Sequence, residues 1–496
     1  MVAQLLHLPL SPFDHVPPCS HAKSLFYFAL KDNVAFSEAF SVLEQGLAKT
    51  FDDLPWLRGK VHHLSKDALG YRPGQLEIRY PQCSDHDASS PLQELKCKKL
   101  DSCFSYADIK ESGFPVDLFT DDELHTGPSW ADVDNGAPVF EVQANFVPGG
   151  CLLCISMCHA VADGAGIVGI LKLWGAYCSQ IGAEGPAPNG LHTKTLLPEK
   201  SADRTVLESI WKKERTQHLI DEMDPAAWEI VGLEGVGPRA STGSLQAASS
   251  VPAVPRKPGE VQKSSIFYTS PEQFEALQKS CAEEQGSHEI SRNDALCGLI
   301  WRSVIRARAA VLSDQVLAAH AESQIVMTVD GREEYSHSLP KDYLGNLVVG
   351  TLPTLTVSQL VAPETTVGSV AQIIRDRAKA ISHTNLMDSF TLLHDEVRDY
   401  GIISLPFTSI EGWSMLISSV LGMKVDEVSF GDAIFKDQGH VGAYRPLMDG
   451  FNSMFRIGVV LPRMKHGGVE FIISLFDDEM DVLLQDEEFA RFASQL

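Results

Sequence analysis

The stretch Cys154-Ile-Ser-Met-Cys-His-Ala-Val-Ala-Asp-Gly-Ala-Gly166 decides how the rest of this sequence is interpreted. It begins as an apolar strand and ends in a run of small residues. His159 and Asp163 stand four positions apart, and two glycines, Gly164 and Gly166, follow at once. Glycine lets a chain turn tightly, and loops held by a rigid scaffold commonly carry function. The pattern predicts that His159 leaves a buried strand, points into a cavity and acts as a general base.

The role of Asp163 depends on the local conformation. In a helix, a residue four positions on would share the face of His159. In a turn, Asp163 would point away and hold the loop by pairing with an arginine. That second role is structural, although it would affect catalysis through the position of His159.

The residues before this stretch predict a hairpin. Residues 138–147 alternate between apolar and polar side chains, residues 148–150 form a turn, and residues 151–157 return as an almost wholly apolar strand. A continuous apolar run is typical of a strand that is buried on both faces. The hairpin therefore delivers His159 from a central strand. A helix is expected from residue 167 onward.

Length and composition suggest two domains and exclude some partners. The chain has 496 residues, 44% hydrophobic and 21% charged, with a net charge of −24. This length exceeds one ordinary core, and such an acidic chain would repel a polyanionic backbone, so nucleic acid is not an expected partner. An anionic ligand would need a local basic patch. The 10 cysteines are interpreted as reduced thiols. The sequence shows neither the pattern of a signal peptide nor that of a membrane span, and we therefore expect a cytoplasmic protein.

The second half repeats the strand and helix rhythm of the first. We expect an α/β protein whose domains are residues 1–200 and 263–496, joined by a crossover at 201–262 with a helix near 206–223. The second half is expected to contain a strand at 266–269, helices at 271–285, 295–309 and 367–384, a strand at 324–330, a hairpin at 455–461 and 469–476, and a closing helix at 479–494. Asn293 or Asp294 is the expected cap of the helix at 295–309.

Other catalytic patterns are missing from the sequence. There is no G-x-S-x-G elbow, no G-x-x-x-x-G-K-[ST] loop and no G-x-G-x-x-G after a strand. His288-Glu289 lacks the second histidine of a zinc-protease helix, and no metal site is expected.

Six blocks in order resemble one family. They are His159 to Gly164, Gln143 to Leu153, Ser291 to Arg302, Val329 to Arg332, Tyr343 to Leu347, and Leu461 to Arg463 with Gly467 and Gly468 behind it. In these blocks, and over nearly its whole length, the chain resembles the BAHD-type acyl-CoA-dependent acyltransferases, in particular the fungal branch with the trichothecene acetyltransferases.

The resemblance implies two chloramphenicol-acetyltransferase-like domains, each a mixed sheet with flanking helices, with a channel between them. Acyl-CoA would enter from one face and a small hydrophobic acceptor from the other. His159 would take the proton of the acceptor, without an acyl-enzyme. The family's aspartate pairs with an arginine, for which Arg292 is the first candidate here and Arg302 the second.

One block departs from the family pattern. The family's D-F-G-W-G loop is matched by Ser429-Phe-Gly-Asp-Ala433, in which Phe430 and Gly431 are kept while Ser429, Asp432 and Ala433 are replacements. This puts the channel shape and CoA handling in doubt. Cys158 stands where many members have a first histidine, but the catalytic position is the second.

The sequence therefore favours an acyltransferase, with acetyl expected most often, acting on a hydroxyl of a small natural product. Acyl-CoA is a co-substrate, no tightly bound cofactor is expected, and the family is usually monomeric. Candidate CoA contacts are Arg256, Lys257 and Lys263, and an oxyanion donor is sought among residues 414–419 or at Ser429. The sequence also allows two other functions. One is CoA-independent acid/base or cyclisation chemistry in the same channel, and the other is non-catalytic binding of hydrophobic ligands.

Overall fold

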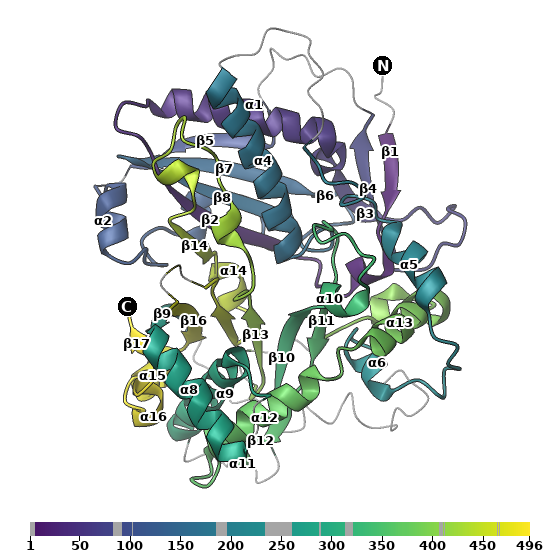
Figure 1. Ribbon diagram of the computed structural model, residues 1–496, viewed down its shortest axis with the longest axis vertical. Coiled ribbons are helices and arrows are strands. Elements are labelled where there is room, and N and C mark those ends of the chain that lie inside the picture. Colours follow the sequence, from purple (N-terminus) through teal and green to yellow (C-terminus); the bar gives the residue numbers. More distant parts are fainter. Residues whose placement is uncertain are drawn as a thin grey trace.

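The computed structural model describes the chain except for residues 1–4, 83–91, 102, 185–195, 234–259, 287–288, 313–320, 406–409, 411, 464 and 466. Within this described part, the strands form three sheets, of four, five and eight strands. Figure 1 shows the five-stranded sheet in the upper part of the molecule, with α1 and α4 across it, and the eight-stranded sheet below. The predicted class, an α/β fold of mixed sheets with flanking helices, is confirmed.

The central strand of the upper sheet is β8 (Gly150–Cys158), and all of its residues are buried. It pairs antiparallel with β2 (His21–Ala29) on one side and with β7 (Phe140–Val147) on the other. The predicted hairpin is thus confirmed, and its turn uses Gly149 at φ +74°. Two neighbouring strands fix the register of β8, so the point at which it ends is also fixed.

Two long helices cover one face of this sheet. α4 (Gly164–Glu184) packs against α1 (Phe36–Asp53), and Trp174 of α4 donates its indole N–H to the carbonyl oxygen of Leu43 at 2.9 Å. A Cβ atom at Gly46 of α1 would lie 2.4 Å from Sγ of Cys178, so this glycine permits the close approach of the helices. The position of α4 sets the position of the turn that precedes it.

The other elements of the first half complete the upper sheet, form a small four-stranded sheet (β1-β4-β3-β6) and cover the second face. They are β1 (Leu5–Pro9), β3 (Lys60–His63), β4 (Leu76–Pro81), β5 (Leu95–Lys99), α2 (Tyr106–Glu111), α3 (Asp121–Leu124) and β6 (Ala137–Pro138). Two further helices, α5 (Val206–Glu214) and α6 (Pro225–Glu229), follow before the second half.

The eight-stranded sheet has the order β11-β10-β13-β15-β16-β9-β17, with β12 paired to β10. Its strands are β9 (Lys263–Thr269), β10 (Glu322–Asp330), β11 (Val348–Thr351), β12 (Thr354–Thr356), β13 (Met415–Ser419), β15 (Ile457–Val460), β16 (Val469–Leu475) and β17 (Ser494–Gln495). Its helices are α8 (Pro271–Gln285), α9 (Arg292–Val311), α10 (Arg332–Tyr335), α11 (Val357–Val361), α12 (Val367–Ala378), α13 (His383–Thr391), α14 (Asp449–Asn452), α15 (Asp477–Leu483) and α16 (Glu487–Ala490).

The start of α9 differs by two or three residues from the predicted cap. The N-cap is Ser291, whose hydroxyl accepts from the backbone N–H of Asp294, and the Asp294 carboxylate accepts from the Ser291 N–H in return. This reciprocal pair is a capping box. Asp294 therefore belongs to the cap without being the N-cap residue.

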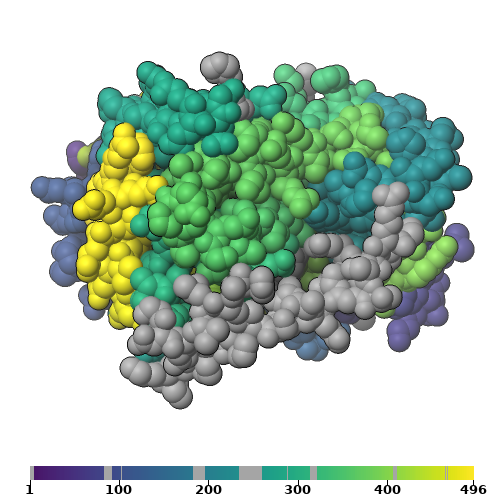
Figure 2. Space-filling model, turned by 90° about the horizontal axis from the view of Figure 1, so that it is seen from below, coloured from purple at the N-terminus to yellow at the C-terminus, as the bar shows by residue number. Residues whose placement is uncertain are grey.

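Three predicted helices are shorter than expected. The helix at 206–223 ends at Glu214, the helix at 367–384 breaks into α12 and α13, and the closing helix breaks into α15 and α16. The chain then ends in β17, which pairs with β9. In Figure 2 the last residues, in yellow, accordingly lie along one side of the second half.

One segment of the second half crosses to the first. Strand β14 (Ala443–Pro446) pairs antiparallel with β2 and forms the edge of the five-stranded sheet (Figure 1). Buried side chains of Val425, Phe430 and Phe435 belong to the same core as α1 and α4. The domain limits at residues 200 and 263 stay a prediction, but the second half is not a unit separate from the first sheet.

Candidate active site

His159 is the first residue after β8. Its backbone N–H donates to the carbonyl oxygen of Ser20 at 2.8 Å, which continues the pairing between β8 and the segment before β2 by one step. The imidazole is half-buried. Its Nδ1 atom is buried and has no hydrogen-bond partner in the part of the chain that the structure describes. The strand thus fixes the backbone of His159 and leaves the imidazole without a recorded hydrogen bond at Nδ1.

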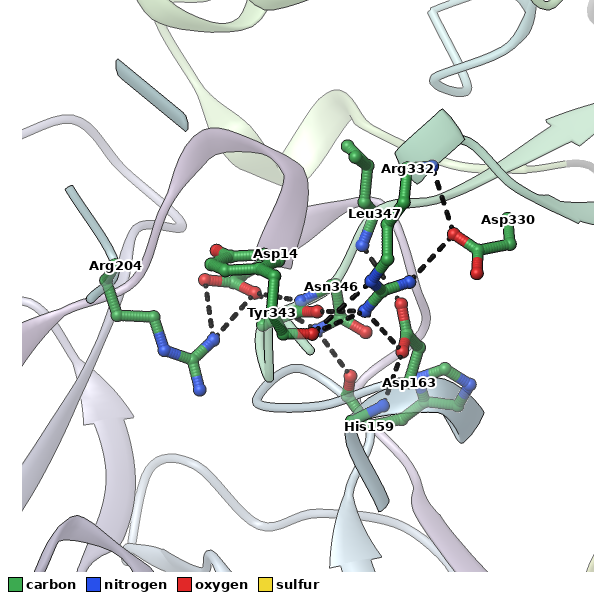
Figure 3. A network of polar contacts seen from close by, with 11 residues as sticks. Asp14, His159, Asp163, Arg204, Asp330, Arg332, Tyr343, Asn346 and Leu347 are labelled. Atoms are coloured by element: carbon green, nitrogen blue, oxygen red, sulfur yellow. Dashed lines mark hydrogen bonds and ion pairs between the residues drawn. The ribbon is translucent and has the colours of Figure 1, made fainter. Parts of the chain in front are cut away.

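Asp163 holds the other end of the turn and precedes α4 directly. One carboxylate oxygen accepts from the backbone N–H of Gly166 at 3.0 Å, and the other accepts from the N–H of Leu347 at 3.0 Å. Arg332 donates to the first oxygen at 2.8 Å (Figure 3). The prediction that Asp163 pairs with an arginine is confirmed, and the carboxylate faces Arg332 and Leu347 of the second half.

The arginine, however, is neither of those expected. Arg292 lies at the start of α9, where it contacts the ring of Phe274 and pairs with Glu275 at 3.9 Å. Arg302, in the middle of the same helix, pairs with Glu488 and donates to the carbonyl oxygen of Ala362. Both choices were therefore wrong, because α9 places these two side chains against other partners within the second half.

Arg332 is held firmly in its place. It also pairs with Asp330 at 2.8 Å and donates to the carbonyl oxygens of Tyr343 and Gly345. Burial lowers the pKa of Arg332, but Asp163 and Asp330 raise it more, so the net pKa is raised. Arg332 is charged at any ordinary pH.

The same balance fixes the charge of Asp163. Its side chain is 1% exposed. Burial raises the pKa of Asp163, but the charge of Arg332 and the hydrogen bonds from Arg332, Leu347 and Gly166 outweigh it and leave the pKa lowered. The carboxylate is therefore ionised at neutral pH and can hold the turn there.

The two glycines of the stretch serve the packing of the turn. A Cβ atom at Gly166 would lie 2.4 Å from the carbonyl oxygen of Leu344, whereas one at Gly164 would lie 3.0 Å from the flexible Sδ of Met423. The start of α4 therefore contacts the loop at 343–347 so closely that a side chain at residue 166 does not fit.

Asn346, Asp14 and Arg204 also belong to the site and were not singled out individually from the sequence. Asn346 donates to the carbonyl oxygen of His159 at 2.9 Å and to Asp14 at 3.1 Å, and Asp14 in turn accepts from Arg204 (Figure 3). The blocks at 329–332 and 343–347 marked Arg332 and Asn346 as part of a pattern. The local sequence does not predict which side chains Arg332 and Asn346 contact.

The altered loop lies against α4. Phe430 is buried and contacts the rings of Trp174 and Phe28, Gly431 has φ +76°, and the hydroxyl of Ser429 donates to the carbonyl oxygen of Gln438. Asp432 is exposed. The kept residues are those that packing and backbone conformation require.

The structure describes only some of the residues proposed to contact CoA or to stabilise an oxyanion. Arg256 and Lys257 lie outside the described residues. Lys263 starts β9, is exposed and pairs with Asp477 at 2.8 Å. In the segment 414–419, Ser419 donates to Asn293 at 2.6 Å. No oxyanion donor is assigned by these contacts.

A cavity of about 400 Å³ opens between the two halves. Its walls come from β2, the segment 115–124, the start of β9 and the segment 445–452. His159 is not among the residues that line this cavity. In the part of the chain that the structure covers, no three metal-ligating side chains gather as a metal site. Nor does any described helix have the length and apolar character to span a membrane.

Two family models match the sequence. Residues 22–178 match the trichothecene 3-O-acetyltransferase-like N-terminal domain, and residues 242–490 match the Transferase family. Together the two models cover most of the chain, with one match in each half. The chain belongs to the Transferase family, the BAHD-type group that the sequence blocks resemble.

Curated relatives span most of this chain. The isocyanide synthase-NRPS hybrid crmA of Aspergillus fumigatus is 29% identical over 98% of this chain, and the enoyl-CoA isomerase/hydratase claC of Penicillium crustosum is 26% identical over 98%. This chain spans 31% and 50% of those two proteins. The eremophilane O-acetyltransferase prx11 of Penicillium rubens is 24% identical over 98% of both chains.

Solved structures share the fold at low sequence identity. The TRI101 protein of F. sporotrichioides, complexed with coenzyme A and T-2, matches with a TM-score of 0.73 and 20% identity over 99% of each chain. Vinorine synthase matches with a TM-score of 0.61 and 15% identity over 98% of this chain and 94% of its own. These likenesses establish the fold.

Proposed function

We propose that this chain transfers an acyl group, with acetyl as the first choice, from acyl-CoA to a hydroxyl of a small hydrophobic natural product. The observation that carries the proposal is His159, a half-buried histidine whose turn is fixed from both halves of the molecule. Several relatives are named as O-acetyltransferases, among them prx11 and the trichothecene 8-O-acetyltransferase of Fusarium sporotrichioides. The TRI101 complex with coenzyme A supports acyl-CoA as the donor.

In the proposed reaction, His159 accepts the proton of the acceptor hydroxyl as the oxygen attacks the thioester carbonyl. The tetrahedral adduct collapses, the carbon–sulfur bond breaks, and the imidazolium returns the proton to the CoA thiolate. Because Nδ1 is buried, Nε2 is the nitrogen assigned to the acceptor. No acyl-enzyme is formed. A positioned base of this kind contributes roughly 10²–10⁴-fold.

Substitution of the base tests the proposal. The wild-type chain and His159→Ala are incubated with acetyl-CoA, butyryl-CoA or hexanoyl-CoA and a panel of hydroxylated sesquiterpenoids, and free CoA and acylated product are measured by mass spectrometry. We expect turnover by the wild type and a loss of about 10²–10⁴-fold in His159→Ala. His337→Ala, which changes an exposed histidine, is the matched control.

Two outcomes would overturn the proposal. If His159→Ala turns over as fast as the wild type, His159 is not the general base. If the wild type shows no turnover and no acyl-CoA at millimolar concentration raises its melting temperature, acyl-CoA is not the donor. A ligand at ~100 times its Kd stabilises a protein by about 2.7 kcal/mol, so binding would be detected. The second outcome would favour CoA-independent chemistry or a binding function.

A further inference from the structure

The carbonyl oxygen of His159 is held by a chain of buried polar residues from three distant segments. Arg204 donates to both oxygens of Asp14, at 3.1 and 3.2 Å, and Asp14 accepts from the side chain of Asn346 at 3.1 Å. The same amide nitrogen of Asn346 donates to the carbonyl oxygen of His159 at 2.9 Å. We name these residues the Asp14 network; Figure 3 shows it reaching His159 through the backbone while the imidazole lies apart from the dashed contacts.

The orientation of the Asn346 amide follows from its neighbours. The Asp14 carboxylate and the His159 carbonyl can only accept hydrogen bonds, so the amide nitrogen, with two hydrogens, must face them. Its oxygen is buried and has no partner among the described residues, so the recorded hydrogen bonds of this side chain are its two N–H donations. Asn346 is therefore a bridge from Asp14 to the residue with the candidate base.

Asp14 anchors this bridge. Its side chain is 0% exposed and that of Arg204 is 3% exposed. Asp14 also accepts from the backbone N–H groups of Asn346 at 3.0 Å and Ser11 at 2.8 Å. A buried carboxylate with this many donors keeps one position, because moving it would leave charges unpaired.

We propose that Asn346, held by Asp14, is a positioning residue for His159. This inference rests on the proposed function. The His159 N–H is fixed by Ser20 and its carbonyl by Asn346, so both peptide groups that flank the imidazole are restrained. Asp163 fixes the end of the turn four residues later, but leaves the peptide of His159 free. The Asp14 network sets the direction in which the imidazole leaves the backbone.

The test variant is Asn346→Ala. It removes the bridge to His159 while the ion pair of Asp14 with Arg204 and the backbone contact of residue 346 stay in place. Asn385→Ala is the matched control, because Asn385 is also a buried asparagine that donates to a carbonyl oxygen, that of Ala380, at 2.9 Å. Asn346→Ser, which keeps one hydroxyl donor, is the rescue variant.

We expect Asn346→Ala to lower kcat by about 10–100-fold, as a misplaced catalytic group does, with KM for acyl-CoA and acceptor unchanged. Asn385→Ala should lower the melting temperature without lowering kcat of the folded protein, and Asn346→Ser should recover part of kcat. An unchanged kcat in Asn346→Ala, or an equal loss in Asn385→Ala, overturns the proposal.

A second readout does not need turnover. Carbethoxylation of His159 by diethyl pyrocarbonate, followed by peptide mass spectrometry, reports the exposure and orientation of its ring. We expect a faster reaction of His159 in Asn346→Ala and the wild-type rate in Asn385→Ala. If the wild type transfers no acyl group, the proposed function fails, and this rate still decides whether Asn346 positions the ring: an unchanged rate means that it does not.

Discussion

At the scale of single residues, the candidate site depends on one carboxylate that is almost wholly buried. Asp163 is buried, ionised and paired with Arg332, and it also caps the turn through the N–H of Gly166. Because water does not reach it, its hydrogen bonds and its ion pair are worth more than the same contacts at the surface. The reverse also holds, since a buried charge without its partner is costly.

Asp163→Asn should therefore destabilise the protein and lower its activity together. The change leaves Arg332 without its buried counter-charge, which costs about 3 kcal/mol, near the low end for a broken buried pair because Asp330 and two carbonyl oxygens remain. Denaturant unfolding of both proteins measures the difference in free energy. Asn385→Ala again serves as a control for the loss of a buried polar contact far from the turn.

The pH dependence of this difference has a definite sign. The pKa of Asp163 is lowered by folding, so its contribution is complete above its unfolded pKa of about 3.9 and is lost as the pH falls through the folded value. We expect the same free-energy difference between wild type and Asp163→Asn at pH 8, 7 and 5. A difference that grows between pH 7 and 5 would mean that the folded pKa is raised, contrary to this expectation.

At the scale of elements, the start of α4 and the loop at 343–347 must lie in contact for the site to exist. Gly166 is the point of contact, and a methyl group there would lie 2.4 Å from the carbonyl oxygen of Leu344. A backbone atom cannot move aside without moving Asn346 and Leu347, which hold the two ends of the turn.

A pair of glycine variants tests this contact. Gly166→Ala should cost about 1–3 kcal/mol through overpacking and reduce kcat, because it separates the turn from Asn346 and Leu347. Gly164→Ala should be tolerated, because the atom that it meets, Sδ of Met423 at 3.0 Å, is the far end of a flexible side chain. Thermal unfolding and turnover of both variants give the comparison. Equal behaviour of the two variants would contradict the role of the close contact.

Much of the architecture was predictable because its signals are local. The alternation of apolar and polar side chains at 138–147, followed by the apolar run at 151–157, predicted β7 and β8. The helix predicted at 271–285 is α8, with the correct bounds. The breaks at 379–382 and 484–486 were missed, because the apolar spacing continues through them. The partner of Asp163 was missed for another reason. Arg332 lies 169 positions away, and only the packing of α10 beside α4 brings the two together.

At the scale of the molecule, the two halves are bound to each other by more than a surface contact. β14 belongs to the second half by sequence and to the first sheet by pairing. Its Arg445, 3% exposed, donates to the carbonyl oxygens of Gly113 and Phe114 in the first half and pairs with Glu470 of β16 at 2.7 Å. Together with the pair Asp163–Arg332, this arginine links the two halves through buried charges.

We therefore expect one cooperative unfolding transition, although a chain of 496 residues with two halves would ordinarily unfold in steps. Scanning calorimetry should give a calorimetric enthalpy close to the van't Hoff enthalpy. Arg445→Met should broaden or split the transition, because it removes the charge that joins β14 to the segment 113–114 of the first half and to β16 of the second half. Arg456→Met is the matched control. Arg456 is also buried and paired, with Glu479, but both belong to the second half, so its loss should lower the midpoint and leave a single transition. Two resolved transitions in the wild type, or the same broadening in both variants, would mean that the halves fold independently and that the site forms where two finished domains meet.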